Sequence, residues 1–203
     1  PEYAGYLDLS NEMGAISVKG LTPKGRHGNP GPRIAETPSG VLNCIGLENP
    51  GAEHFVTDIL PELKKYDVPL LANMSAGTVE EFAWMAETLS VDGIAGLEVN
   101  VSCPNVECEG MAFGVDPKVV EQVTKAVRKV TDKPVIVKLS PNVTDIVEIA
   151  KAVEAGGGNG VSLINTLLGM AIDIHRRKPL LGNIYGGLSG PAVKPVALRM
   201  VHQ

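Results

Sequence analysis

The sequence predicts a parallel α/β fold, and three features lead to this prediction. Short apolar runs rich in β-branched residues alternate with amphipathic runs of helical periodicity. Two short runs, residues 69–71 and 135–137, are apolar throughout, as expected of strands covered on both faces. The 203 residues include 23 glycines and 15 prolines, an excess that indicates many connecting loops.

Each element of this pattern has its own local signals. The first helix is expected to begin after Thr78 as N-cap and to reach about residue 89. The second starts with Asp116 as N-cap and Pro117 at the first position, and runs to about residue 130. The third opens within residues 142–145 and ends at glycines 156–158, and a last helical pattern begins at Pro191. The expected strands are residues 14–18, 68–72, 96–99, 134–137 and 160–164.

Two long segments, residues 21–50 and 165–190, contain much of the glycine and proline and are interpreted as irregular loops, which at this length are usually functional. The glycine cluster at residues 186–190 is consistent with a backbone nest for an anion, a nonspecific signal. Because no linker or shift in composition divides the chain, residues 1–203 are expected to form a single domain.

The composition excludes several functional classes. Acidic residues outnumber basic ones by 23 to 18, and no lysine- or arginine-rich run occurs, so nucleic acid is not expected as a partner. No apolar stretch approaches the ~20 residues of a transmembrane helix. Cys44, Cys103 and Cys108 form no C-x-x-C pair, which argues against a disulfide framework or a metal site. We therefore expect a soluble cytoplasmic protein that binds no metal through this chain.

A polar residue closes or follows each predicted strand. From the second strand onward the spacing is 27, 38 and 27 residues, the length of one β/α unit each, so these side chains should meet at the C-terminal edge of one parallel sheet. Ligands bind at that edge in barrels and in open α/β sheets. The five residues are Lys19, Asn73, Asn100, Lys138 and Asn165.

The two lysines are the most informative members of this set. Lys19 and Lys138 end core strands, where an unpaired charge is strongly disfavoured. An anionic ligand would supply the missing partner, and a buried carboxylate elsewhere in the chain would do the same.

Two loops add further candidates. Cys103 lies within residues 100–105, a polar turn directly after a strand, where a thiol can serve as nucleophile or general base. Cys44 and Cys108 are interpreted as buried small side chains. Residues 37–50 combine turn residues with amide side chains, which suit a planar ligand with alternating donors and acceptors. The four histidines are interpreted as surface or loop residues.

Seven motifs together make the sequence resemble the catalytic flavoprotein subunit of a class 1 dihydroorotate dehydrogenase, most closely the NAD-linked class 1B. The resemblance covers essentially the whole chain, and the N-x-S-C-P-N element combined with the strand-end lysines is its most specific part. Gly20 departs from the family pattern, which has a small residue with a side chain there. The motifs are residues 18–20, 28–37, 43–47, 100–105, 137–142, 164–166 and 187–191.

The resemblance implies a (β/α)8 TIM barrel that binds FMN at its C-terminal face and oxidises dihydroorotate to orotate in pyrimidine biosynthesis. The chain would cover about strands 2 to 6, as an incomplete barrel truncated at both ends and without the FMN phosphate site. Cys103 would be the catalytic base. Substrate would be bound by Lys19, Asn43, Cys44, Ile45, Gly46, Leu47, Asn100, Asn165 and Thr166. FMN would be bound by Lys19, Gly20, Asn73, Asn100, Lys138, Ile164 and Gly190.

The implied partners are an electron-transfer subunit with FAD and a [2Fe–2S] cluster, and a second copy of this chain in a homodimer within a heterotetramer. A fumarate-using class 1A enzyme is equally compatible with the cysteine content. Three alternatives remain: a flavin domain similar to dihydropyrimidine dehydrogenase, a lyase barrel with Lys138 or Lys19 as a Schiff-base lysine, and a fragment that is inactive as given.

Overall fold

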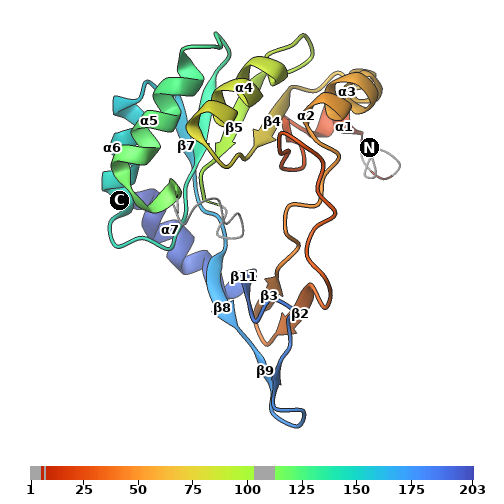
Figure 1. Ribbon diagram of the computed structural model, residues 1–203, viewed down its shortest axis with the longest axis vertical. Coiled ribbons are helices and arrows are strands. Elements are labelled where there is room, and N and C mark those ends of the chain that lie inside the picture. The colour runs from red at the N-terminus through yellow and green to blue at the C-terminus, as the bar shows by residue number, and fades with distance from the viewer. Residues whose placement is uncertain (1–5, 7, 103–112) are drawn as a thin grey trace.

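The computed structural model describes residues 6, 8–102 and 113–203. Its upper part in Figure 1 is a parallel sheet with helices packed on one side, and its lower part is an antiparallel sheet from which a hairpin extends. The predicted parallel α/β architecture is therefore confirmed, and a second sheet is added to it.

The parallel sheet contains the five strands that the sequence predicts. They lie side by side in chain order, every neighbouring pair is parallel, and this order is that of consecutive strands in a barrel wall. Among the described residues, β1 and β7 are the outer strands. The strands are β1 (Ile16–Ser17), β4 (Leu70–Met74), β5 (Gly96–Asn100), β6 (Val135–Lys138) and β7 (Gly160–Ser162).

Three helices cover one face of this sheet: α4 (Val79–Leu89), α5 (Pro117–Arg128) and α6 (Ile146–Ala155). α4 and α5 begin at their predicted N-caps, Thr78 and Asp116, and α6 begins at Asp145, within the predicted residues 142–145. The side chain of each of these residues accepts a backbone N–H of the first turn. The helices bury the apolar side chains of the central strands. Leu97, Val99, Val135 and Val137 are completely inaccessible to solvent.

The opposite face of the parallel sheet is polar. Side chains alternate between the two faces of a strand, so Glu98 and Asn100 lie opposite the helix-facing Leu97 and Val99. The register places Asn73 beside Glu98 and Asn100 beside Lys138. The strand-end residues are thus brought to one face, as predicted.

The expectation that residues 21–50 and 165–190 are irregular is wrong in part. They contain a four-stranded antiparallel sheet in the order β2-β3-β11-β8, and a two-stranded hairpin. The predicted glycine nest is also wrong, because residues 185–189 form strand β11. These strands have two to five residues, and the pairing of β3 with β11 joins the two segments across a long sequence distance. They are β2 (Ile34–Thr37), β3 (Gly40–Asn43), β8 (Leu167–Met170), β9 (Ile172–Asp173), β10 (Lys178–Pro179) and β11 (Tyr185–Ser189).

A helical run before β4 was not predicted: α2 (Ala52–His54), a π-helical turn (Phe55–Ile59) and α3 (Leu60–Leu63) follow one another, and a short helix, α1 (Leu9–Glu12), precedes β1. A 3-10 turn (Phe113–Val115) leads into α5. The last predicted helix is confirmed, as a 3-10 turn (Pro191–Val193) followed by α7 (Lys194–His202). Within the described parts of the chain, every helix is too short or too polar to cross a membrane.

We expect Thr78→Ala to lower the free energy of unfolding by about 1 kcal/mol, because the variant loses the N-cap of α4. Thr78 Oγ1 accepts the N–H of Glu81 at 3.1 Å, and Glu81 Oε2 accepts the N–H of Gly77 at 2.8 Å. Urea unfolding of the full-length subunit measures the change. Thr78→Ser keeps the acceptor and should unfold like the wild type; equal destabilisation by both substitutions would contradict the cap.

Candidate functional site

A cavity of about 470 Å³ lies where the C-terminal ends of the parallel strands meet the antiparallel sheet. One wall comes from β1, β4, β5 and β6 and from the segments that follow β1 and β7. The other comes from the end of β3, the segment after it and the middle of β11. Eleven of the residues predicted for substrate or FMN line it: Lys19, Gly20, Asn43, Ile45, Gly46, Leu47, Asn73, Asn100, Lys138, Asn165 and Thr166.

Three predicted residues are absent from the cavity wall. The side chain of Cys44 is fully buried beneath the antiparallel sheet with Leu42 and Leu181, and its Sγ lies 3.6 Å from the carbonyl oxygen of Pro32. Ile164 packs against the main core. Gly190 follows β11, where its backbone approaches Gly40. Cys103, the predicted base, lies outside the described residues, as does Cys108.

The two lysines differ in their surroundings. Lys138 is half-buried, as the argument from burial requires, whereas Lys19 is exposed, so that argument does not apply to it. No carboxylate of the described residues lies within 4.0 Å of either ammonium group. Together with Glu98, these lysines are the charged residues of the cavity wall.

Sequence reasoning missed Glu98, which lies in the middle of β5 and faces the cavity. Its carboxylate accepts hydrogen bonds from Ser17 Oγ at 2.9 Å, from Ser162 Oγ at 2.8 Å and from Asn73 Nδ2. Burial raises the pKa of Glu98, but these hydrogen bonds and the charge of Lys138 outweigh it, so the pKa lies below its ordinary value. The sequence feature that could have indicated a functional role is a charged residue inside an apolar strand, two positions before Asn100.

A second hydrogen-bonded group closes the end of the cavity near β7. Asn100 Oδ1 accepts from Ser102 Oγ at 2.7 Å and from Asn165 Nδ2 at 3.4 Å. Asn165 Nδ2 also donates to Ser102 Oγ at 2.6 Å, and Asn165 Oδ1 accepts the N–H of Thr166 at 2.8 Å. Asn100 and Asn165, predicted as substrate ligands, are thus held in fixed orientations.

Residues 43–47 form the roof of the cavity, and Asn49 anchors this segment to the barrel wall. Asn49 Oδ1 accepts the N–H groups of Thr22 at 3.1 Å and Gly51 at 2.8 Å. Its Nδ2 donates to Thr22 Oγ1 at 2.8 Å and to the carbonyl of Leu47 at 2.6 Å. Nothing in the sequence indicates that the Asn49 amide stabilises the fold and does not bind a ligand.

Gly20 and Gly187 mark places where the backbone passes close to a side chain. A Cβ on Gly20 would lie 2.9 Å from Asn73 Oδ1, and one on Gly187 would lie 1.9 Å from Thr166 Oγ1. The departure of Gly20 from the family pattern therefore has a steric reason, because a side chain there would displace the Asn73 amide.

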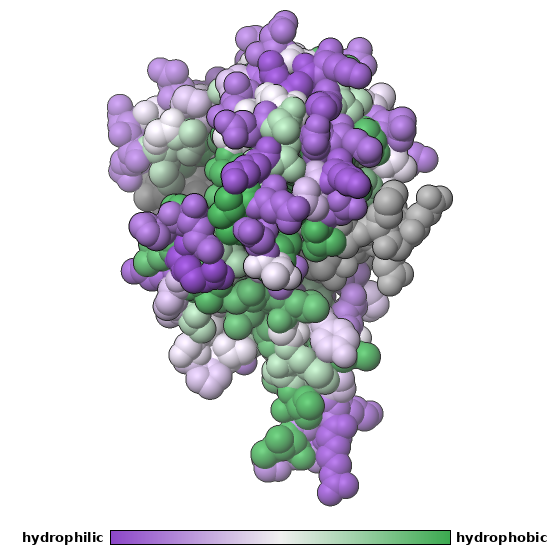
Figure 2. Space-filling view, turned by 90° about the vertical axis from the view of Figure 1, so that its left-hand side faces the viewer, coloured by the Kyte–Doolittle hydropathy of each residue, from purple (hydrophilic) through white to green (hydrophobic). Residues whose placement is uncertain are grey.

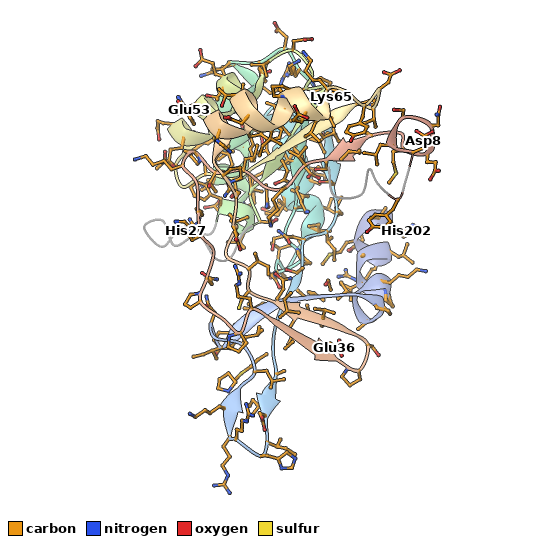
Figure 3. All side chains as sticks on the ribbon, turned by 90° about the vertical axis from the view of Figure 1, so that its right-hand side faces the viewer. Asp8, His27, Glu36, Glu53, Lys65 and His202 are labelled. Carbon is orange, nitrogen blue, oxygen red and sulfur yellow. The ribbon has the colours of Figure 1, made fainter. Side chains whose placement is uncertain are left out.

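The histidines take no part in the cavity. His27, His54, His175 and His202 are all exposed, as predicted, and Figure 3 shows His27 and His202 on opposite sides of the molecule. The described residues contain no cluster of three or more His, Cys, Asp or Glu that could hold a metal ion.

The arrangement suits a planar, negatively charged heterocycle. Lys19 and Lys138 provide positive charge, while Asn43, Asn100 and Asn165 provide amide donors and acceptors. The volume falls within the ~300–1,000 Å³ of small-molecule sites. Since fixed dipoles and charges need no rearrangement during reaction, such a wall can stabilise charge that develops on a bound ring.

The chain is similar to known proteins along its whole length. Residues 1–203 match the family model described as dihydroorotate dehydrogenase. Three relatives carry the name dihydroorotate dehydrogenase B (NAD(+)), catalytic subunit: those of Alkaliphilus metalliredigens (55% identical), Desulforamulus reducens (59%) and Listeria monocytogenes (53%). The alignments cover 100% of this chain and 67%, 66% and 66% of these relatives, so the chain spans about two thirds of their length.

We expect the contribution of Glu98 to stability to depend on pH. Because its folded-state pKa is lowered, that contribution is fully present above the unfolded value of about 4.3 and is lost as the pH falls through the folded value. The difference in unfolding free energy between wild type and Glu98→Gln should therefore shrink at acidic pH, as urea unfolding at a series of pH values would measure.

Glu53→Gln provides the control, because it removes an exposed carboxylate on α2 that is not among the residues lining the cavity. A difference between wild type and Glu98→Gln that stays constant from neutral pH to pH values below about 4.3 would contradict a lowered pKa at Glu98.

Proposed function

Since the chain belongs to the dihydroorotate dehydrogenase family, we propose that residues 1–203 form one domain of an NAD-linked catalytic subunit that oxidises dihydroorotate to orotate in pyrimidine biosynthesis. The match of residues 1–203 to the family model confirms the family predicted from the motifs. The observation that carries the proposal is the convergence of eleven predicted ligand residues on one cavity with two lysines in its wall.

Members of this family are flavin-dependent, and we take the flavin here to be FMN. The residues present fit such a group. Lys19, Lys138 and Asn100 offer charge and amides to a ring system, Gly20 leaves backbone accessible, and Asn73 Oδ1 offers an acceptor. FMN, when bound, supplies the acceptor for the hydride that leaves C6 of dihydroorotate. A cation such as Lys138 beside the ring would stabilise the negative charge that develops there.

The substrate would be held by the roof and by the amide group near β7. Asn43, Asn100, Asn165 and Thr166 provide amide and hydroxyl groups for the ring, and the exposed Lys19 provides a cation for the carboxylate. Fixing the ring in one orientation can contribute ~7–11 kcal/mol in favourable cases. Cys103 would take the proton from C5, since a thiol in cation-rich surroundings can reach a pKa suitable for a base.

The relatives' name, catalytic subunit, implies a second subunit. We take it to be an electron-transfer subunit with FAD and a [2Fe–2S] cluster, joined to a homodimer of catalytic subunits in the cytoplasm. Figure 2 shows apolar side chains gathered over the antiparallel sheet and the hairpin below it. Leu168, Met170, Ile172 and Ile174 are 41–76% exposed there, a surface consistent with contact to another subunit.

We expect Cys103→Ala to retain flavin but to lose reduction by substrate. In the wild-type full-length subunit with its partner, anaerobic dihydroorotate should bleach the flavin absorbance, and NAD+ should restore it. The variant should bleach at least 100-fold more slowly, because general base catalysis contributes about 10²–10⁴-fold. Stopped-flow absorbance measures the rate.

Cys44→Ala removes a buried thiol whose side chain points away from the cavity and controls for the loss of a cysteine. Bleaching of Cys103→Ala at the wild-type rate would exclude Cys103 as the base. Turnover with fumarate but not with NAD+ would indicate class 1A. A borohydride-trapped adduct on Lys138 or Lys19, without any flavin in the purified protein, would indicate the Schiff-base alternative.

A further inference from the structure

Glu98 has no role in the function proposed above, although its carboxylate contacts three strands of the parallel sheet besides its own. It accepts hydrogen bonds from Ser17 of β1, Asn73 of β4 and Ser162 of β7. In the strand order β1-β4-β5-β6-β7, Ser17 and Ser162 each lie two strands away from β5. One carboxylate in the wall of the cavity therefore connects the outer strands β1 and β7 to the central strand β5.

A purely structural role explains this carboxylate poorly. Moving a charge from water into a partly buried site is unfavourable, and neutral side chains of similar volume often serve packing as well or better. Glu98 nevertheless has two donors on Oε2 and one on Oε1, which is the hydrogen-bond pattern of an ionised carboxylate. The site is therefore built to keep a negative charge between the two cations, Lys19 and Lys138.

The carboxylate also determines how Asn73 is oriented. Because both oxygens of Glu98 are acceptors, the Asn73 amide must turn its Nδ2 group toward Glu98. Its Oδ1 then points to the opposite side, where a Cβ on Gly20 would lie 2.9 Å away. The side chain of Asn73 is buried, and its oxygen is the atom left to accept a hydrogen bond at the cavity.

We propose that Glu98 is a positioning residue of the flavin site, which fixes Asn73 with its oxygen toward the cavity and supplies a negative charge that offsets the lysines under the bound ring. The inference rests on the proposed function, because it assumes that this cavity binds FMN. It predicts two separable effects: loss of the hydrogen bond changes FMN affinity through Asn73, and loss of the charge changes the reduction potential of the flavin.

The hydrogen-bond effect is tested with Glu98→Ala in the full-length subunit with its partner, stripped of flavin and titrated with FMN. We expect the Kd to rise about tenfold, the size of effect that follows from losing one hydrogen bond to a charged group. If Glu98 acts through Asn73, the double variant Glu98→Ala/Asn73→Ala should bind FMN within about twofold of Asn73→Ala alone.

The charge effect is tested with Glu98→Gln, which keeps an oxygen to accept from Asn73 and nearly the same volume. Its Kd for FMN should stay within about threefold of the wild-type value, because the hydrogen bond is retained. Removing a negative charge beside a group that gains electrons favours the reduced form, so the midpoint potential should become more positive. Spectroelectrochemical titration measures it, and Glu53→Gln should leave it unchanged.

The outcomes separate this inference from the proposed function. If the wild-type protein binds no FMN, both fail. If wild type binds FMN and is reduced by dihydroorotate, but Glu98→Gln keeps the wild-type potential and Glu98→Ala the wild-type Kd, only the positioning role is overturned. Additive losses in the Glu98→Ala/Asn73→Ala variant would contradict action through Asn73. If Glu98→Ala does not fold, the potential of Glu98→Gln alone supports or overturns the role of the charge.

Discussion

The register of the parallel strands is the constraint on which both the core and the cavity depend. Leu97, Val99 and Val137 face the helices because every second side chain does so, and the same alternation turns Glu98 and Lys138 to the other face. A shift of one residue in β6 would bury Lys138 under the helices and turn Val137 toward the cavity, and the same shift in β5 would bury Glu98. The register that buries the apolar side chains on the helix face of the sheet therefore also determines which polar side chains face the cavity.

Several polar side chains of the cavity wall are held in place by hydrogen bonds to their neighbours. No buried side-chain nitrogen or oxygen in the described part of the chain lacks a hydrogen bond. Asn73 and Asn100 are both buried, and each is held by a hydrogen bond to a neighbouring side chain. Because such groups do not need to reorient when a ligand arrives, the wall presents fixed donors and acceptors, as precise recognition of a rigid ring requires.

The features that sequence reasoning predicted correctly have local signals. Thr78, Asp116 and Asp145 are capping residues directly before the helices α4, α5 and α6. Apolar runs of four or five residues predict the strands. The lysines and asparagines at strand ends share a cavity because parallel strands end at one edge. The antiparallel sheet was not predicted because its strands are short, and because the pairing of Asn43 with Gly187, which joins its two halves, spans most of the chain.

The role of Glu98 in the cavity wall was not predicted for a related reason. Its significance comes from lateral neighbours on β1, β4 and β7, which no pattern along a single strand reveals. Lys19 is exposed because β1 is an outer strand among the described residues, a property of the strand order and not of its own sequence. The burial of the Cys44 side chain with Leu42 and Leu181 depends on how β2, β3 and β11 pair, which the local sequence does not reveal.

The pairing of β3 with β11 also bears on how the roof of the cavity forms. Asn43 pairs with Gly187, and the loop that this pairing closes contains four of the five strands of the parallel sheet, β4 to β7. Closing a loop of this length costs conformational entropy, which the contacts between β3 and β11 must outweigh. The ligand-binding roof therefore depends on a pairing that spans most of the chain. A substitution that weakened this pairing would loosen the roof while leaving the main core of the parallel sheet intact.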